Sequence, residues 1–266
     1  MSAPTGWWQV RAAVAGEWRK VRRSRVPAIT LLAFTVAPAI GGLFMFIVAN
    51  PDRARRLGLL GQKAQLAGLS ADWPGLLMFS AQVVAVGSLL AYAFIITWLF
   101  GREFTDGTAH YLMALPVTRS WIVTAKLLVY LAWAALLALW LVTVTAAIGA
   151  AMDLPGWSAG TAGTGVARIL VAATLMAVAL TPLAWVASRA RGYLTALSTA
   201  LVMLAGAQIA AVLGWGNVVP WAVPALAAGL APGQHATATS IALCIATGLA
   251  GAAAAIRWWN SPEAGL

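Results

Sequence analysis

Long apolar runs separated by short polar stretches dominate the chain. A helix needs about 20 apolar residues, at about 1.5 Å each, to cross the hydrocarbon of a bilayer. Six runs are long enough and hold no acidic residue: Val26–Ala49, Gly75–Phe100, Ile122–Ala151, Thr164–Ala187, Tyr193–Leu213 and Ala236–Ile256. This pattern predicts an all-α integral membrane protein with six transmembrane helices. Proline disfavours a regular helix, so Thr181-Pro182 predicts a kink in the fourth.

Two further segments predict helices that do not span. Gly6–Arg23 places tryptophan and valine on one helical stripe, with basic residues opposite, which is typical of an amphipathic helix in the plane of the inner leaflet. A disordered basic tail is the weaker alternative. Gly214–Gln234 contains Pro220 and Pro224 in an apolar setting and predicts a short outer-face or re-entrant helix before the last span. The residues of the first stripe are Trp7, Val10, Val14, Trp18 and Val21, and those of its polar face are Gln9, Arg19, Lys20 and Arg23.

Composition excludes a soluble fold. Of the 266 residues, 62% are hydrophobic and 9% charged, whereas a soluble domain carries about 25% charged residues. The net charge of +10 does not indicate nucleic-acid binding, because the basic residues form short clusters between apolar runs rather than one basic face. Three parts are expected: an interfacial helix at 1–25, a six-helix membrane domain at 26–257 and a tail at 258–266.

The basic residues also predict orientation. Counted on alternate sides of the six spans, twelve Lys and Arg fall on the side of the N-terminal cluster and five on the other. The positive-inside rule then places both termini in the cytoplasm, although the cluster Arg53–Arg56 is an exception on the outer side. Lys126 and Arg168 fall near span ends, where we expect their side chains to extend to the headgroups.

The connection between spans two and three carries the most chemical information. It begins at Gly101, holds two of the seven acids, Glu103 and Asp106, and continues to Arg119. Asp106–Leu115 predicts a short helix that Pro116 stops. Such a surface helix suits docking to a soluble partner, but an ordinary solvated loop explains the spacing equally well.

At this connection the sequence resembles a known family, the type-2 ABC exporter permeases. It is most similar to the six-helix permeases of bacterial antibiotic and lantibiotic-immunity exporters. The resemblance covers Glu17–Arg25 and Gly101–Lys126. The residues that carry it are Glu17-Trp18-Arg19-Lys20, Arg23-Ser24-Arg25, Glu103, Gly107-Thr108, Leu115-Pro116-Val117, Arg119 and Lys126.

The resemblance implies a permease subunit that lies in a bacterial cell membrane and is not itself an enzyme. It implies that ATP is bound and hydrolysed by a separate nucleotide-binding subunit, that this chain holds no cofactor or metal, and that a second permease half, identical or different, completes the pathway. The sequence contains no Gly-x4-Gly-Lys-Ser/Thr motif, which agrees with an ATPase elsewhere. The implied coupling residues are Glu103, Asp106, Gly107, Thr108 and Arg119, and the implied interfacial contacts are Trp7, Trp18, Arg19 and Lys20.

Several alternatives remain open. A secondary transporter is disfavoured because all seven acids lie outside the predicted spans, and an embedded enzyme because no HExxH motif occurs. A channel or a membrane anchor stays possible. Gln82 and Gln208 are the notable polar groups within spans; we favour hydrogen bonds to neighbouring helices over a role in lining the substrate path. Neutral spans favour export of a hydrophobic or amphipathic compound or peptide, which the sequence does not identify.

Overall fold

The computed structural model of the chain describes residues 7–50, 56, 70–109, 111, 118–231 and 233–262, with the side chain of Trp7 left aside. Within these residues the regular structure is entirely helical, and six helices are long and apolar enough to cross a membrane, which confirms the predicted fold class. They are α2 (Val26–Ala49), α4 (Trp73–Thr105), α6 (Arg119–Ala151), α7 with α8 (Ala159–Arg189), α9 (Leu194–Val212) and α11 (Ala238–Asn260).

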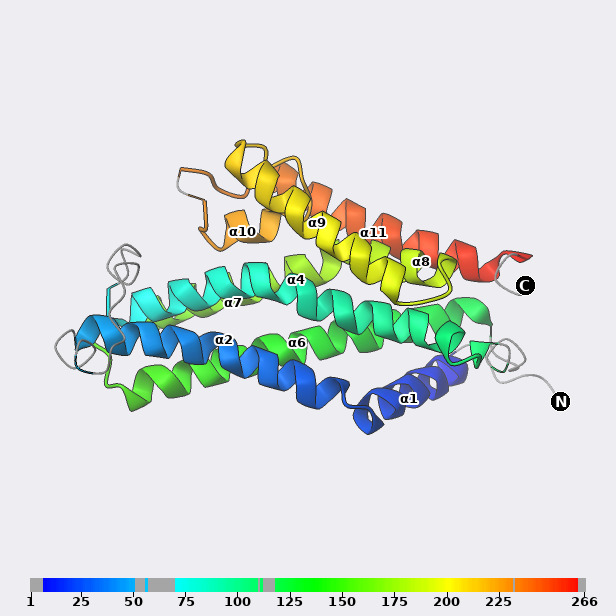
Figure 1. Ribbon diagram of the computed structural model, residues 1–266, viewed down its shortest axis with the longest axis horizontal. Coiled ribbons are helices and arrows are strands. Elements are labelled where there is room, and N and C mark those ends of the chain that lie inside the picture. The colour runs from blue at the N-terminus through cyan, green and yellow to red at the C-terminus, as the bar shows by residue number, and fades with distance from the viewer. Residues whose placement is uncertain are drawn as a thin grey trace.

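The helices form an elongated bundle with α4 near its centre (Figure 1). α4 packs against α2, α6, α7, α8 and α9, and it contains fully buried apolar residues along its length, such as Leu76, Ile96 and Phe100. α9 and α11 instead expose much of their apolar surface, for example at Val202 and Leu249. Because apolar side chains are stable in hydrocarbon, this exposure is what a lipid-facing helix requires.

A shorter helix, α1 (Trp7–Arg23), precedes the first span and packs mainly against α6. The chain bends at Ser24 and Arg25, and Pro27 then occupies the first turn of α2, where a missing N–H leaves no helix hydrogen bond unmade. α1, the last turn of α4 and the last turns of α11 lie at the same end of the bundle (Figure 1). Segments distant in sequence therefore meet at this end.

The fourth span is broken where the sequence predicts a kink. α7 (Ala159–Ala179) ends before Thr181, and α8 (Pro182–Arg189) begins at the proline. Pro182 has no N–H to donate, and the Thr181 hydroxyl donates to the carbonyl of Gly248 in α11. A Cβ on Gly251 would lie 2.4 Å from the nitrogen of Pro182, so glycine is what allows α11 to approach the break this closely.

The segment before the last span contains a five-residue helix, α10 (Val223–Ala227), flanked by turns. The indole of Trp221 donates to the carbonyl of Ala179 at 3.1 Å, which ties this segment to the end of α7. A short helix thus occurs where the two prolines predict one. Its position on an outer face stays a prediction.

Candidate functional site

The last turns of α4 differ from the sequence prediction. The second span was expected to end at Phe100 and a connection to begin at Gly101, but α4 continues to Thr105. Gly101 explains the extension, because a Cβ at this position would lie 2.7 Å from the backbone nitrogen of Tyr193. One side of the turn is therefore packed tightly against the start of α9. Glu103 follows on this turn and is only 4% exposed.

Asp106, Gly107 and Thr108 end α4 and do not begin a new helix at Asp106, so that part of the prediction is wrong. Gly107 adopts a φ of +69°, which glycine tolerates without a Cβ clash. Its N–H donates to the carbonyl of Phe104 at 3.3 Å, and the Thr108 N–H donates to the carbonyl of Glu103 at 2.8 Å. This pair of bonds is the Schellman pattern of a helix C-terminus.

The rest of the predicted coupling helix falls largely outside the described residues. Ala109 and Tyr111 are helical, and the Tyr111 N–H donates to the carbonyl of Thr108 at 3.1 Å. Residues 110 and 112–117, which include the predicted stop at Pro116, lie outside the described part. On the preceding turn, Arg102 Nε pairs with Asp106 Oδ2 at 3.0 Å, and both side chains are more than 40% exposed.

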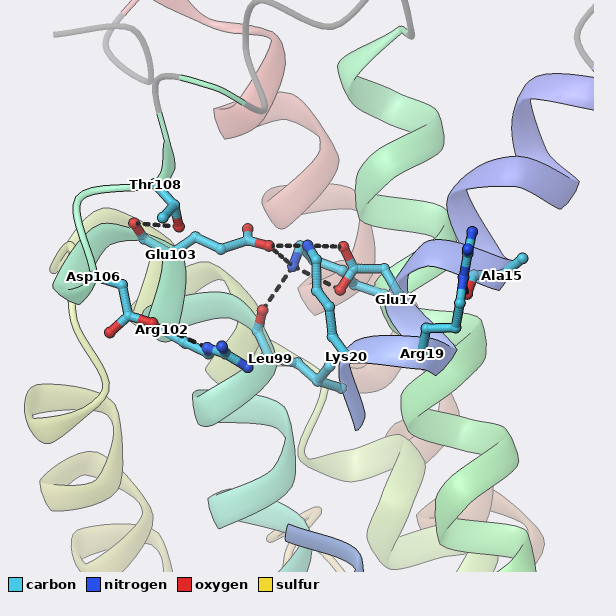
Figure 2. A network of polar contacts seen from close by, with 10 residues as sticks. Ala15, Glu17, Arg19, Lys20, Leu99, Arg102, Glu103, Asp106 and Thr108 are labelled. Carbon is cyan, nitrogen blue, oxygen red and sulfur yellow. Dashed lines mark hydrogen bonds and ion pairs between the residues drawn. The ribbon is translucent and has the colours of Figure 1, made fainter. Parts of the chain in front are cut away.

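Four charged side chains meet at this end of α4, and we call them the ion cluster: Glu17 and Lys20 from α1, Glu103 from α4 and Lys126 from α6 (Figure 2). Lys20 Nζ lies 2.7 Å from Oε1 of Glu17 and 2.7 Å from Oε1 of Glu103. Lys126 Nζ lies 3.1 Å from Oε2 of Glu17 and 2.8 Å from Oε1 of Glu103. Each cation thus bridges both carboxylates, and three helices are joined through four charges.

Lys126 is the most deeply buried member of the cluster, so the expectation that it extends to the headgroups is wrong. It is 0% exposed and, besides the two carboxylates, donates to the carbonyl of Leu99 at 2.8 Å. Removing an ammonium group from water is costly, and three oxygen acceptors are the kind of compensation that such burial needs. Lys126 therefore fastens α6 to both α1 and α4.

α1 reaches the cluster through its apolar stripe. Val21 is fully buried, and the Trp18 ring meets the edge of the Trp133 ring with centroids 5.9 Å apart. Glu17 lies one turn before Val21 and is carried inward with it. Lys20, which the sequence places on the polar face of the helix, reaches the two carboxylates and keeps 37% of its side chain exposed.

The remaining interfacial residues do not join the cluster. Arg19 is exposed and donates from Nε to the carbonyl of Ala15 at 3.1 Å. Trp7 is the first residue of α1, and its side chain lies outside the described part. That α1 lies on a membrane surface stays a prediction.

The cluster changes the acidity of the two α1 side chains. Burial by itself raises the pKa of Glu17, but the charges of Lys126 and Lys20 outweigh it, and the pKa lies below the ordinary 4.5. Burial likewise acts to lower the pKa of Lys20, but Glu103 and Glu17 outweigh it, and the pKa lies above 10.5. Both groups are therefore charged at neutral pH, and their attraction to Lys126 and Glu103 holds α1 against α6 and α4.

A cavity of about 340 Å³ lies beside the cluster. Its lining includes Glu17, Lys20 and Glu103 from the cluster, together with Trp98, Leu99, Arg102, Asp106, Thr108 and Tyr111. The second oxygen of Glu103, Oε2, is buried and has no hydrogen-bond partner among the described residues. Within this part of the chain no group of three or more His, Cys, Asp and Glu side chains could hold a metal ion.

The other predicted site residues lie apart from the cluster. Arg119 is the first residue of α6 and donates to the carbonyl of Trp259 in α11 at 3.4 Å. Gln82 donates to the carbonyl of Gly229 at 3.3 Å, in the turn that follows α10 and not in a neighbouring helix. Gln208 is exposed on α9. Within the described part, no hydrogen bond joins the two glutamines.

The pairing of Glu17 with Lys126 could not be predicted, although both lie in the segments that carry the resemblance. The two residues are 109 positions apart, and nothing in local spacing brings α1 onto α6. One signal was present. Lys126 stands among apolar neighbours within a span, and such a cation needs a buried anion or a route to water.

Comparison with known proteins supplies the family. The family model described as ABC-2 family transporter protein matches residues 13–206, a stretch that contains all four members of the ion cluster. No curated protein matches the chain significantly. Because the match covers most of the chain, the protein belongs to the ABC-2 transporter family and is a multi-pass membrane protein.

Proposed function

We propose that this member of the ABC-2 family is the membrane-spanning permease subunit of an ATP-driven exporter. ATP would be bound and hydrolysed by separate ABC ATPase subunits, and a second permease half, identical or different, would complete the pathway. Family membership supports the proposal, as does the lack of a phosphate-binding Gly-x4-Gly-Lys-Ser/Thr motif in the sequence.

The observation that carries the proposal is the ion cluster on the last turn of α4. The segment that leaves this turn is the one that we expect to contact the ATPase, and Glu103 binds cations from both α1 and α6 immediately before it. A displacement of the segment would therefore move three helices and not the end of α4 alone. Rigid, mutually fastened elements of this kind can carry energetic coupling between distant sites.

The exposed residues around the turn provide groups for a partner to contact. Tyr111 is 78% exposed, and the side chains of Arg102 and Asp106 are 41% and 48% exposed. Glu103 is unsuited to direct contact because it is buried and already paired. We therefore assign partner contact to the residues from Asp106 onward and transmission into the bundle to Glu103.

We propose further that the protein lies in a bacterial inner membrane with both termini in the cytoplasm. The charge asymmetry of twelve against five supports this orientation. The cargo would be a hydrophobic or amphipathic compound or peptide, moved outward, as in the antibiotic and lantibiotic-immunity exporters that the sequence resembles. Away from the ion cluster at their ends, the six predicted spans hold no acidic residue, which supports this class of cargo over small ions.

Copurification tests the proposed subunit role. The tagged full-length chain is extracted in mild detergent and the proteins that accompany it are identified by mass spectrometry. We expect an ATPase subunit that carries the phosphate-binding motif missing here. A pure preparation that exports its cargo without ATP would favour a channel or secondary transporter.

Cysteine labelling tests the orientation. After Cys244→Ser, the variants Asp106→Cys and Trp157→Cys each place one exposed thiol in a connection at opposite ends of the bundle. The proposal predicts that an impermeant reagent labels intact cells at residue 157 and not at residue 106. The reverse pattern would place both termini outside.

A further inference from the structure

A second feature lies on the surface that α8 and α11 share, and its lining contains no acidic residue among those that the structure describes. It is an open groove of about 550 Å³, lined by Trp185, Ala250, Ala253, Ala254, Arg257, Trp258 and Ser261. Its floor consists of three alanines on two adjacent turns of α11, and Arg257 lies one turn beyond them. The rise from residue 250 to residue 257 is about 10 Å. The groove therefore runs along the helix from an apolar floor to a single positive charge.

Arg257 is the cation of this groove. It is exposed and makes no hydrogen bond or ion pair with any residue that the structure describes. Lys20 and Arg102, by contrast, are each paired with carboxylates. The last turn of α11 ends at Asn260, so Arg257 lies where a spanning helix meets the headgroup layer. A cation at that depth, beside two tryptophans, is placed to meet a phosphate.

We propose that this groove binds an anionic glycerophospholipid, with the headgroup phosphate at Arg257 and the upper part of an acyl chain along Ala250, Ala253 and Ala254. The indole rings of Trp185 and Trp258 flank the site, and indole prefers the same interfacial layer as the headgroup. Alanine side chains leave room for a chain to lie against the helix, and their methyl surface suits hydrocarbon.

The charge of the lining selects anionic over zwitterionic lipids. The described lining holds one arginine and no carboxylate, so it attracts a headgroup of net negative charge. The ammonium group of a zwitterionic headgroup would find no anion among these residues. Basic pockets between transmembrane helices bind anionic lipid headgroups in this manner.

The proposal is tested on the purified full-length protein in detergent, without ATPase or cargo, so its result is independent of the proposed transport function. Phosphatidylglycerol or phosphatidylcholine is added at equal mole fraction, and the apparent melting temperature and the lipid retained in native mass spectrometry are measured. We expect phosphatidylglycerol to raise the melting temperature more and to be retained selectively. Equal effects of the two lipids would overturn the proposal.

Two variants and a matched control locate the site. Arg257→Gln should lower the affinity for phosphatidylglycerol by about tenfold or more, because a hydrogen bond to a charged group contributes roughly 10- to 100-fold. Ala253→Leu fills the groove without changing charge and should have a similar effect. Arg168→Gln removes another exposed arginine, on α7, and should leave the selectivity intact. The proposal of a specific site would be contradicted if Arg257→Gln kept the full preference for phosphatidylglycerol. It would also be contradicted if Arg168→Gln lost as much of this preference as Arg257→Gln.

Discussion

The ion cluster and the α8–α11 groove lie at the same end of the bundle, but their cations differ in burial and in pairing. In the cluster, Lys126 is 0% exposed and is held by two carboxylates and a carbonyl. In the groove, Arg257 is exposed and has no partner among the described residues. The first cation is used to hold the fold together, and the second is available to something outside the chain.

The difference follows from what surrounds each cation. α1 and α4 both supply an acid to the cluster, so the charges of the lysines can be neutralised within the protein. α8 and α11 supply only alanine, tryptophan and serine around Arg257. Buried charge is tolerated only when it is paired, whereas charge at a headgroup layer can be paired by lipid. A cation near a span end can therefore be paired within the protein or left for a lipid to pair, depending on which anions lie within reach.

Removing a cluster cation should have the largest effect. Lys126→Met leaves two buried carboxylates with only Lys20 to balance them, and loss of one partner of a buried pair costs about 3–5 kcal/mol. We expect a strongly lowered free energy of unfolding, measured by thermal or denaturant unfolding in detergent. The double variant Glu17→Met with Lys126→Met keeps the Lys20–Glu103 pair and should recover part of the loss. If Lys126→Met unfolds like the wild type, the cluster does not hold the helices together.

Acidity should loosen α1 in a defined direction. Glu17 has a pKa below its ordinary 4.5 in the folded protein, so its stabilising contribution is present above pH 4.5 and is lost as the pH falls through the folded value. Lys20 has a pKa above 10.5, so its contribution is present below pH 10.5 and is lost as the pH rises through the folded value. Between these limits the contact of Trp18 with Trp133 should stay intact. Tryptophan fluorescence plotted against pH should therefore show a plateau there. Glu17→Gln should remove the loss of stability at low pH. If that loss is unchanged in the variant, it comes from another group.

The end of α4 should tolerate change better than the cluster. Gly107→Ala places a Cβ in a backbone with φ of +69°, which costs roughly 1 kcal/mol. Gly87→Ala is the matched control, because that glycine is exposed within the same helix and a Cβ there meets nothing within 4 Å. The free energy of unfolding in detergent should fall for Gly107→Ala and change almost not at all for Gly87→Ala. Equal effects would argue against the Schellman ending.

The smallest effect is expected for the exposed pair on the same turn. Arg102→Gln breaks the ion pair with Asp106, and a solvent-exposed pair contributes about 0–1 kcal/mol. Its free energy of unfolding should stay close to that of the wild type. A loss as large as that of Lys126→Met would mean that exposure does not distinguish the two ion pairs.

The six spans could be predicted from the sequence because crossing a bilayer imposes length and composition on each helix separately. The end of α4 could not, because Arg102, Glu103 and Thr105 have the composition of a loop. What keeps them helical is the packing of Gly101 against Tyr193, a residue 92 positions away along the chain, together with the cations that reach Glu103. A pattern along one segment contains no record of these partners.

The candidate site shows the same limit. The motif around Glu103 was visible in the sequence, and so was the stripe of α1, but their meeting point was not. Lys20 was expected on the polar face of its helix, and only the position of Glu103 in space explains which anion on α4 it reaches. Gln82 bonds a carbonyl, but that carbonyl belongs to Gly229 in a turn 147 positions away, which the pattern of its own helix does not indicate.

The most direct test of the central claim is ATP hydrolysis by the permease–ATPase complex with Glu103→Gln. The substitution keeps the size of the side chain and removes its charge, and Arg102→Gln on the same turn is the control. The complex is reconstituted in nanodiscs, and a compound that stimulates ATP hydrolysis is first selected on the wild type. We predict that Glu103→Gln assembles with the ATPase but loses stimulation by the compound, while Arg102→Gln keeps it. Stimulation of the Glu103→Gln complex at the wild-type level would contradict transmission through the ion cluster.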